Sequence, residues 1–178
     1  DLFHARLNSH TYPRHWHNEY AIGFVHRGCG VNTVDRDPVA YPSRSIILMN
    51  PGQVHTGFSA GQNDLHYSMF YIDPGIFEKD GLTAMNKPYF PFPIIERSPV
   101  REKIASVFND IFTSGRVKKE DVLSSLYRII QSLKDGGFLS LDAADPAYRE
   151  RKIDAVCRFV QSHYHEKIAI EQIARYVN

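Results

Sequence analysis

Hydrophobic residues along this chain follow one period before residue 98 and another after it. In the first part, short apolar runs alternate with turn-forming Gly, Pro, Asn and Asp, which is typical of β-strands. The runs are IGFVH (22–26), VNTV (31–34), SIILM (45–49), VHTGF (54–58) and LHYSMFYI (65–72). Strands at this spacing predict an antiparallel sandwich or barrel. Several prolines within residues 86–99 then predict an extended connection without a helix.

After Pro99 the apolar positions recur at steps of three and four, which predicts two amphipathic helices. The first covers about residues 100–112, and the second runs from about Glu120 to Lys134. One interpretation is that both helices bury their apolar stripe against the barrel. The alternative is that the second helix supplies the seam of a homodimer. The candidate contacts for that seam are Leu126, Ile130 and Leu133.

A third block follows Asp145-Pro146 and contains two further helical patterns. They are the stretch 153–164 and, after a break at 165–167, the stretch IAIEQIARYVN (168–178). Two helices of this size are too small for a domain, so we expect the opening of a second one. The predicted organisation is a barrel over 1–97, a helical segment over 98–137, a linker over 138–148 and the start of another domain over 149–178.

Composition narrows the class of protein. Of 178 residues, 43% are hydrophobic and 23% are charged, which is ordinary for a globular protein. The net charge of +1 gives the chain no overall basic field for nucleic acid. No apolar run reaches the roughly 20 residues that a bilayer requires, so no membrane partner is expected. Cys29 and Cys157 form no CxxC motif, which fits a reducing compartment and a cytoplasmic protein.

The stretch HWHNE (15–19) places His15, His17 and Glu19 at alternate positions, and on a strand these would share one face. His55 follows a Pro-Gly turn and enters a strand that can lie beside them in a barrel. Imidazoles on neighbouring strands suit zinc, nickel or iron(II). Neutral imidazoles can equally bind the hydroxyls of a sugar or a carboxylate. The sequence therefore predicts either a metal site at the three histidines or direct contact with an organic ligand.

Two further side chains are candidates for the same interior. Arg27 has the same parity as the histidines of HWHNE, and Tyr67 shares a face of the 65–72 strand with Met69 and Tyr71. Aromatic residues with a few polar groups are what a small-molecule pocket needs. We expect Tyr67 to contact a ligand and Met69 and Tyr71 to belong to the core.

The order HxHxE followed by PGxxH resembles the cupin barrel signature, in which two His and a Glu on one strand and a later His surround a metal. Glu19 stands closer to the second histidine here than in that signature. This resemblance implies a cupin-like barrel. It leaves open a metal sensor, or a metal-dependent dioxygenase or isomerase in which Fe(II) or Mn(II) supplies the chemistry.

The order of pieces along the whole chain resembles the AraC family of bacterial transcription regulators. GFVHRGCGVNT (23–33), PSRSIILMNPGQVHTG (42–57) and HYSMFYIDP (66–74) look like that family's sensor barrel. IDAVCRFVQSHYHEKIAIEQIARYVN (153–178) looks like the start of its DNA-binding domain, which contains two helix-turn-helix units. The implied fold is mainly β with C-terminal helices: a cupin-like antiparallel β-barrel of jelly-roll type, two amphipathic helices and a partial helix-turn-helix.

The resemblance also implies the effector-sensing and dimerising part of a regulator, an activator or a repressor, and not an enzyme. The effector would be a small polar molecule, a sugar or a small acid, and the arm from Asp1 to about Tyr12 is a candidate lid over it. Its candidate contacts are His15, His17, Glu19, Arg27, His55 and Tyr67. We expect a homodimer, and promoter DNA as a partner only of a longer protein that includes the recognition helices.

Overall fold

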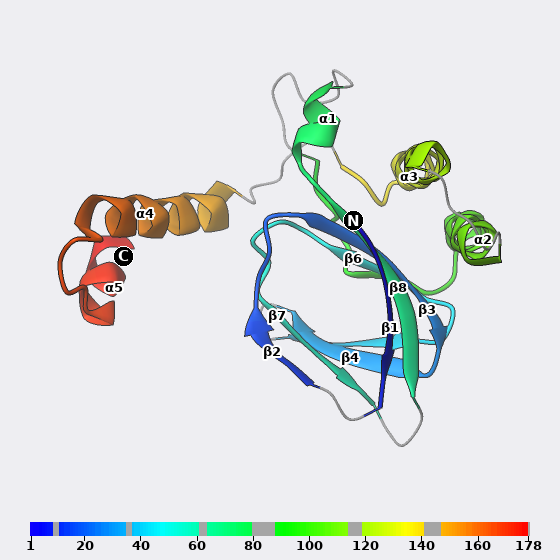
Figure 1. Ribbon diagram of the computed structural model, residues 1–178, viewed down its shortest axis with the longest axis horizontal. Coiled ribbons are helices and arrows are strands. Elements are labelled where there is room, and N and C mark those ends of the chain that lie inside the picture. The colour runs from blue at the N-terminus through cyan, green and yellow to red at the C-terminus, as the bar shows by residue number, and fades with distance from the viewer. Residues whose placement is uncertain are drawn as a thin grey trace. The chain divides into compact units, whose positions relative to one another are not determined.

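The computed structural model describes residues 1–8, 11–34, 37–60, 64–79, 88–113, 119–140 and 147–177. The chain divides into two compact units, Asp1–Asp142 and Ala143–Asn178. The strands of the first unit are β1 (Leu2–Leu7), β2 (Thr11–His15), β3 (Tyr20–Arg27), β4 (Cys29–Val34), β5 (Asp37–Pro42), β6 (Ile46–Met49), β7 (His55–Ser59), β8 (Leu65–Ile72) and β9 (Ile94–Ile95). Its helices are α1 (Gly75–Lys79), α2 (Pro99–Thr113) and α3 (Lys119–Asp135) (Figure 1). The domain boundaries predicted at residues 97, 137 and 148 stay predictions.

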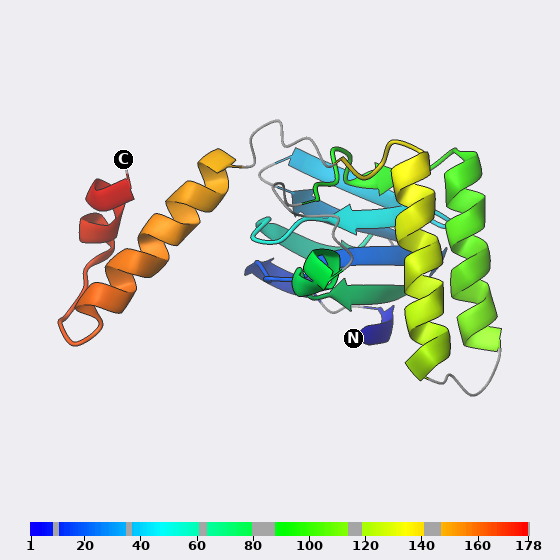
Figure 2. The same cartoon turned by 90° about the horizontal axis from the view of Figure 1, so that it is seen from above.

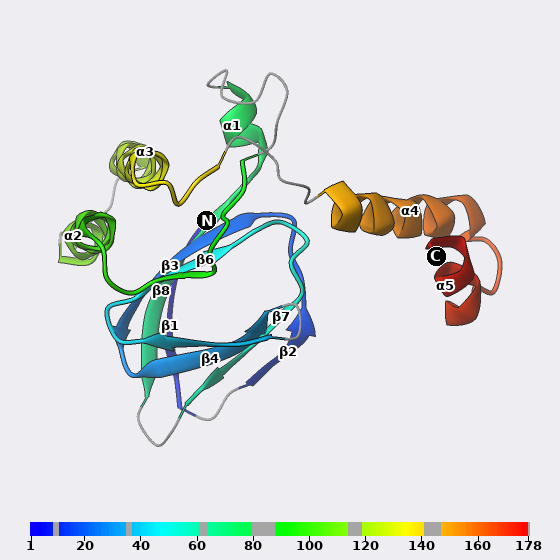
Figure 3. The same ribbon diagram turned by 180° about the vertical axis from the view of Figure 1, so that it is seen from behind.

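Two antiparallel sheets face each other in the first unit (Figure 1, Figure 3). The five-stranded sheet has the order β1-β8-β3-β6-β9, and the four-stranded sheet has the order β2-β7-β4-β5. The chain passes repeatedly from one sheet to the other, which is the connectivity of a jelly roll. The predicted cupin-like barrel followed by helices is confirmed.

The five-stranded sheet is buried on both faces. On β3, Ala21 and Val25 belong to the cluster between the two sheets, whereas Ile22 and Phe24 belong to the cluster under the helices. A strand that is covered on both faces gives a continuous apolar run, which is how YAIGFV reads in the sequence.

Helices α2 and α3 lie side by side across the outer face of this sheet (Figure 2). Leu126, Ile130 and Leu133 of α3 are buried within the single chain, with 6%, 6% and 0% of their surface exposed. They belong to the same cluster as Ile22 and Phe24. The interpretation in which this stripe packs on the barrel describes them within the single chain, and the prediction that they form a dimer seam stays a prediction. On the other side of α3, Leu123 and Tyr127 are exposed apolar residues.

The second unit contains α4 (Ala147–His163) and α5 (Ile170–Val177), joined at the break predicted from the sequence. The Phe159 ring stacks on the His163 ring at 4.4 Å between centroids and lies 5.0 Å from the Tyr176 ring of α5. The contact between Phe159 and Tyr176 joins the two helices. None of the described helices is long and apolar enough to cross a membrane.

Candidate functional site

A cavity of about 220 Å³ lies between the two sheets of the first unit. Its volume lies just below the usual range for small-molecule pockets, which begins at roughly 300 Å³. The wall from the five-stranded sheet consists of Phe3, Leu7, Val25, Ile47, Met49, Leu65, Tyr67, Met69 and Tyr71. The wall from the four-stranded sheet consists of Tyr12, His15, Gly30, Asn32, Tyr41, His55, Thr56, Gly57 and Phe58. A ligand in this cavity would therefore touch both sheets at once.

Met69, which lines the cavity, packs closely against Gly23. This residue pairs with Met69 across β3 and β8. A Cβ at Gly23 would lie 2.7 Å from the Sδ of Met69 and 2.9 Å from its Cε. Met69 thus lies directly over the glycine, and a larger residue there would displace the Met69 side chain, which lines the cavity.

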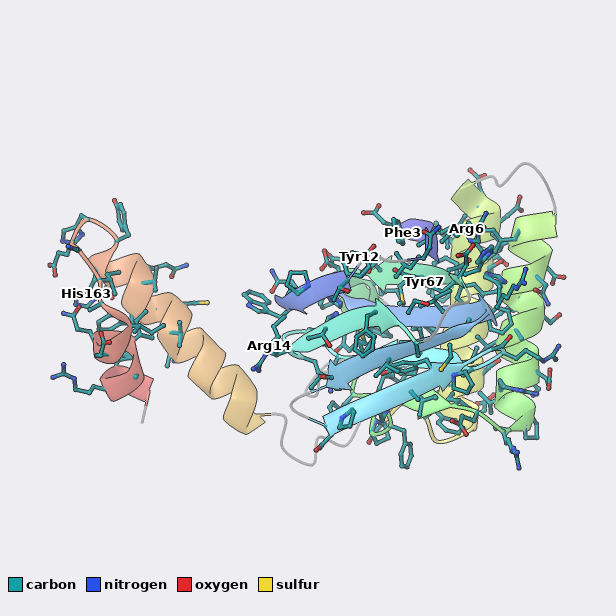
Figure 4. The ribbon with its side chains drawn as sticks, turned by 90° about the horizontal axis from the view of Figure 1, so that it is seen from below. Phe3, Arg6, Tyr12, Arg14, Tyr67 and His163 are labelled. Carbon is teal, nitrogen blue, oxygen red and sulfur yellow. The ribbon has the colours of Figure 1, made fainter. Side chains whose placement is uncertain are left out.

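Three aromatic residues from three strands gather at one part of the wall (Figure 4). The ring of Phe3 on β1 lies 6.2 Å from that of Tyr67 on β8, and the Tyr67 hydroxyl shares a hydrogen bond with Tyr12 on β2. Burial is the main reason that the pKa of Tyr67 is raised, and the hydrogen bond with Tyr12 raises it further. The N-terminal arm, predicted as a lid, includes β1. This strand pairs with β8 from Leu2 to Leu7 and so forms part of the cavity wall.

The three predicted histidines come together, although not by the predicted route. Strand β2 ends at His15, and His17 and Glu19 follow it outside any strand, so the prediction of a single HWHNE strand is wrong. The ring centroids of His15 and His55, paired across β2 and β7, are 4.3 Å apart. The ring of His17 lies 5.1 Å from that of His55 and 6.5 Å from that of His15.

All three imidazoles are held in the same tautomer by the backbone. The Nδ1 atoms of His15, His17 and His55 lie 2.7, 2.8 and 2.8 Å from the carbonyl oxygens of Pro13, Glu19 and Gln53. Because a carbonyl only accepts, each Nδ1 carries the proton and donates it, and each Nε2 presents a lone pair. Each of these three carbonyls lies two residues from its histidine along the chain, so the local backbone orients all three rings.

His17 is half-buried, whereas His55 is buried and His15 is exposed. The Nε2 of His17 is buried without a hydrogen-bond partner. Burial lowers the pKa of His17, while the carbonyl and the charge of Glu19 oppose that shift. His17 is thus held neutral, with its Nε2 facing away from water.

Tyr41 contributes a second polar atom without a partner. Its side chain is fully buried, it lines the cavity, and its hydroxyl makes no hydrogen bond. Burial raises the pKa of Tyr41, so the hydroxyl keeps its proton. Buried hydroxyls are normally paired, and an unpaired one that borders a cavity is a place for a ligand atom.

Residues 1–141 match the family model described as the AraC-like ligand binding domain. The chain belongs to this family. The resemblance seen in the sequence is thereby confirmed. A curated relative, the uncharacterized HTH-type transcriptional regulator YbfI of Bacillus subtilis (strain 168), is 24% identical over 169 residues. That match covers 92% of this chain and 60% of YbfI, so the chain spans less than two thirds of the relative's length.

Solved structures show the same fold for this AraC-like domain. The AraC-like transcriptional activator CuxR superposes with a TM-score of 0.59 at 13% identity, over 99% of this chain and 66% of that one. An apo ToxT variant from Vibrio cholerae gives a TM-score of 0.55 at 15% identity, over 97% of this chain and 68% of that one. ToxT bound to (E)-4-(8-methylnaphthalen-1-yl)but-3-enoic acid gives a TM-score of 0.50 at 15% identity. This match covers 97% of this chain and 69% of that one.

Three predicted ligand contacts of the AraC-like domain, His17, Glu19 and Arg27, lie outside the cavity wall. Arg27 is exposed at the end of β3, where the pairing with β8 shifts register after Val25, so the parity argument fails for it. Glu19 is half-buried but does not line the cavity, and its backbone carbonyl is the part that contacts His17. His15, His55 and Tyr67 do line it. Their role as ligand contacts stays a prediction.

The metal prediction also stays a prediction. Among the described residues, no three His, Cys, Asp or Glu side chains form a group that could hold a metal ion. The tautomers nevertheless match those of metal-binding histidines, which donate one nitrogen to a carbonyl and bind through the other.

Several wall residues were missed or misassigned in the sequence. Met69 and Tyr71, predicted as core, line the cavity as well as packing in the cluster between the sheets. Tyr41 was missed because residues 37–42 contain two prolines and read as a turn. The alternation of Ala5, Leu7 and Phe3 toward one face of β1 was a signal that could have identified that strand.

Proposed function

We propose that this AraC-like domain senses a small organic effector in the cavity between its sheets and so controls DNA binding by a longer protein. The observation that carries the proposal is a cavity walled by both sheets, with polar tips such as His15, Tyr41 and Tyr67 among apolar residues. Such a site binds a small molecule and orients it. ToxT, which has the same fold, binds an organic acid. On sequence grounds the effector is a sugar or a small acid.

The proposed role is binding and not catalysis. The matching family model describes a ligand-binding domain, and YbfI is a transcriptional regulator. Metal-dependent oxygenase or isomerase chemistry has no comparable support. A regulator of transcription would act in the cytoplasm, where its DNA lies.

Strand β1 gives the effector a route to the helices. Phe3 faces the cavity, while His4, the next residue, faces the opposite side and contacts Phe112 of α2. An effector that favours one position of β1 would bias the position of α2 through this pair. Only a difference in affinity between two such arrangements shifts their populations.

The experiment is a thermal-shift screen of sugars and small organic acids on three proteins. In Gly23→Ala the new methyl group displaces Met69 and reduces the cavity. In Ile22→Val, a control on the same strand, a methyl group is lost from the face under the helices. An effector should stabilise the wild type and Ile22→Val alike and Gly23→Ala much less. Equal stabilisation of all three would place the compound outside the cavity and contradict the proposal.

We also propose that the protein is a homodimer that associates through the outer face of α3. With Leu126, Ile130 and Leu133 buried in the chain itself, the remaining apolar candidates are Leu123 and Tyr127, which are 41% and 45% exposed. Tyr127 borders a groove between α2 and α3. Exposed apolar side chains beside a groove are suited to a second copy of the same helix.

A metal ion is the second candidate ligand, because one observation favours it. The backbone leaves the Nε2 atoms of His15 and His17 as acceptors, and the one of His17 is buried without a partner. Zinc, nickel or iron(II) would take such nitrogens. In that case the domain would sense the metal itself.

A further inference from the structure

We propose that the effector is an uncharged cyclic molecule whose hydrogen-bond acceptor meets the hydroxyl of Tyr41 in the buried part of the cavity. This inference rests on the proposed function, which it narrows. Of the two classes expected from the sequence, it keeps neutral ring compounds such as sugars and excludes small acids.

The first argument is the charge of the wall. No Asp, Glu, Lys or Arg occurs among the described residues that line the cavity. Arg27, the cation expected to meet an acid, is exposed at the end of β3. The carboxylate of an acid would therefore lose its water without gaining a cation, which is costly. The carboxylate of Glu19 acts electrostatically on His17 and on Tyr71, a residue of the cavity wall, and would repel an anion.

The second argument is that the cavity offers one hydrogen-bond donor, the Tyr41 hydroxyl, and one acceptor, the Nε2 of His15. The Tyr41 hydroxyl is buried, borders the cavity and has no hydrogen-bond partner, so it is available as a donor. The imidazole of His15 donates through Nδ1 to Pro13, which leaves Nε2 as an acceptor. A molecule with an acceptor at one place and a donor at another satisfies both atoms, as alcohols, amides and sugars do.

The third argument is the shape of the remaining wall. Rings of Phe3, Tyr12, Tyr67 and Tyr71 and the thioether of Met69 surround a volume of about 220 Å³. Aromatic faces and a polarisable sulfur suit the flat side of a ring. The same aromatic wall would accept a cation through its π-faces. A test must therefore compare neutral, anionic and cationic forms of one skeleton.

The experiment uses two matched sets of probes, measured by calorimetry at millimolar concentration. One set is benzamide, benzoate and benzamidine, and the other is D-glucose and D-glucuronate. A pH of about 8 keeps imidazoles above their ordinary pKa and thus neutral. The two sets distinguish an aromatic from a sugar ring, while the members of each set differ in charge.

We expect benzamide or D-glucose to bind at least about tenfold more tightly than its charged counterparts. Tyr41→Phe should weaken that neutral probe by about three- to tenfold, the effect of one lost hydrogen bond. Tyr164→Phe removes the same oxygen from a 77% exposed tyrosine of the second unit and should leave the affinity unchanged. A charged probe that binds as tightly, an unchanged affinity in Tyr41→Phe, or no binding by either neutral ring would each overturn the inference.

Stability separates a folding defect from a lost contact. Because the Tyr41 hydroxyl has no partner in the protein, Tyr41→Phe without a probe should melt at the same or a higher temperature than the wild type. A lower melting temperature would show a partner for the hydroxyl and remove the second argument. A charged probe that stabilises the wild type but not Gly23→Ala would overturn this inference and leave the proposed function standing.

Discussion

The imidazole of His4 on β1 lies 5.1 Å, between ring centroids, from the ring of Phe112 on α2. The Nδ1 of His4 is also 2.9 Å from the Oγ of Ser68, which is 2.6 Å from the Nε2 of His26. Phe3, one residue earlier, faces the cavity on the other side of the same strand. Consecutive residues of β1 therefore contact the cavity on one face of the strand and the helix layer on the other.

Stability should fall in mildly acidic solution because of this cluster. Burial is the main reason that the pKa of His26 lies below its ordinary 6.5. Electrostatic repulsion by His4 and His66 lowers it further. Between the folded pKa and 6.5 the unfolded chain binds more protons, so the free energy of unfolding falls as the pH drops below 6.5. The free energy of unfolding stops falling once the pH is below the pKa of His26 in the folded protein. Urea denaturation at pH values of about 5.5 and 7.5 measures the difference.

The variant His26→Gln should show a smaller loss of stability between those two pH values than the wild type. His17, whose pKa burial also lowers, accounts for part of the remainder. The same loss in His26→Gln as in the wild type would mean that His26 does not couple protons to folding.

Phe3 should matter for the effector more than for the fold. Its side chain is 41% exposed, so Phe3→Ala should cost less than about 1 kcal/mol of unfolding free energy. The loss of one wall of the cavity should weaken an effector from the screen by about fivefold. Phe92→Ala, which removes the same ring from a 53% exposed site outside the wall, is the control. Calorimetry that gave the two variants equal affinities would argue against β1 as a cavity wall.

Two leucines of α3 should have opposite phenotypes. Leu133 is fully buried, so Leu133→Ala should lower the free energy of unfolding by about 2–5 kcal/mol. Leu123 is 41% exposed, so Leu123→Asp should leave stability almost unchanged and convert dimers into monomers. Sedimentation velocity at matched concentrations tests the second effect. A Leu123→Asp protein that sediments like the wild type would remove this face from the interface.

Purified, untagged protein should carry far less than one equivalent of transition metal. The ring centroids of His15 and His17 are 6.5 Å apart, and the described residues contain no three-ligand group for a metal. Elemental mass spectrometry after incubation with zinc and nickel measures the content. Close to one equivalent that is lost in a His15→Ala/His55→Ala protein would instead make the histidines a metal site.

The hydrophobic period predicted the core elements well because local pattern and burial agree there. The strand around IGFVH and the two helices after Pro99 are all covered on the face that the pattern indicates. HWHNE failed because a long-range contact decides its course. The Gly52 amide donates to the carbonyl of His17, and the chain leaves the strand after His15. The residues of HWHNE alone do not predict this contact with Gly52.

Other failures have equally specific causes. Tyr41 lies on β5, an edge strand, where prolines are tolerated because an edge has unpaired positions. Arg27 lies beyond an irregularity in pairing that reverses its parity. The stripe with Leu126 and Leu133 did predict burial, but an apolar stripe does not reveal whether the same chain or a second one covers it.

The most direct test of the account is methyl NMR on protein labelled at methionine, because Met49 and Met69 both line the cavity. Their signals can be assigned with Met49→Leu and Met69→Leu and then followed while an effector from the screen is added. The account predicts that both signals shift and saturate at the dissociation constant that calorimetry gives. If the compound stabilises the protein while both methyl signals stay in place, it binds elsewhere, and the cavity between the sheets is not the sensor.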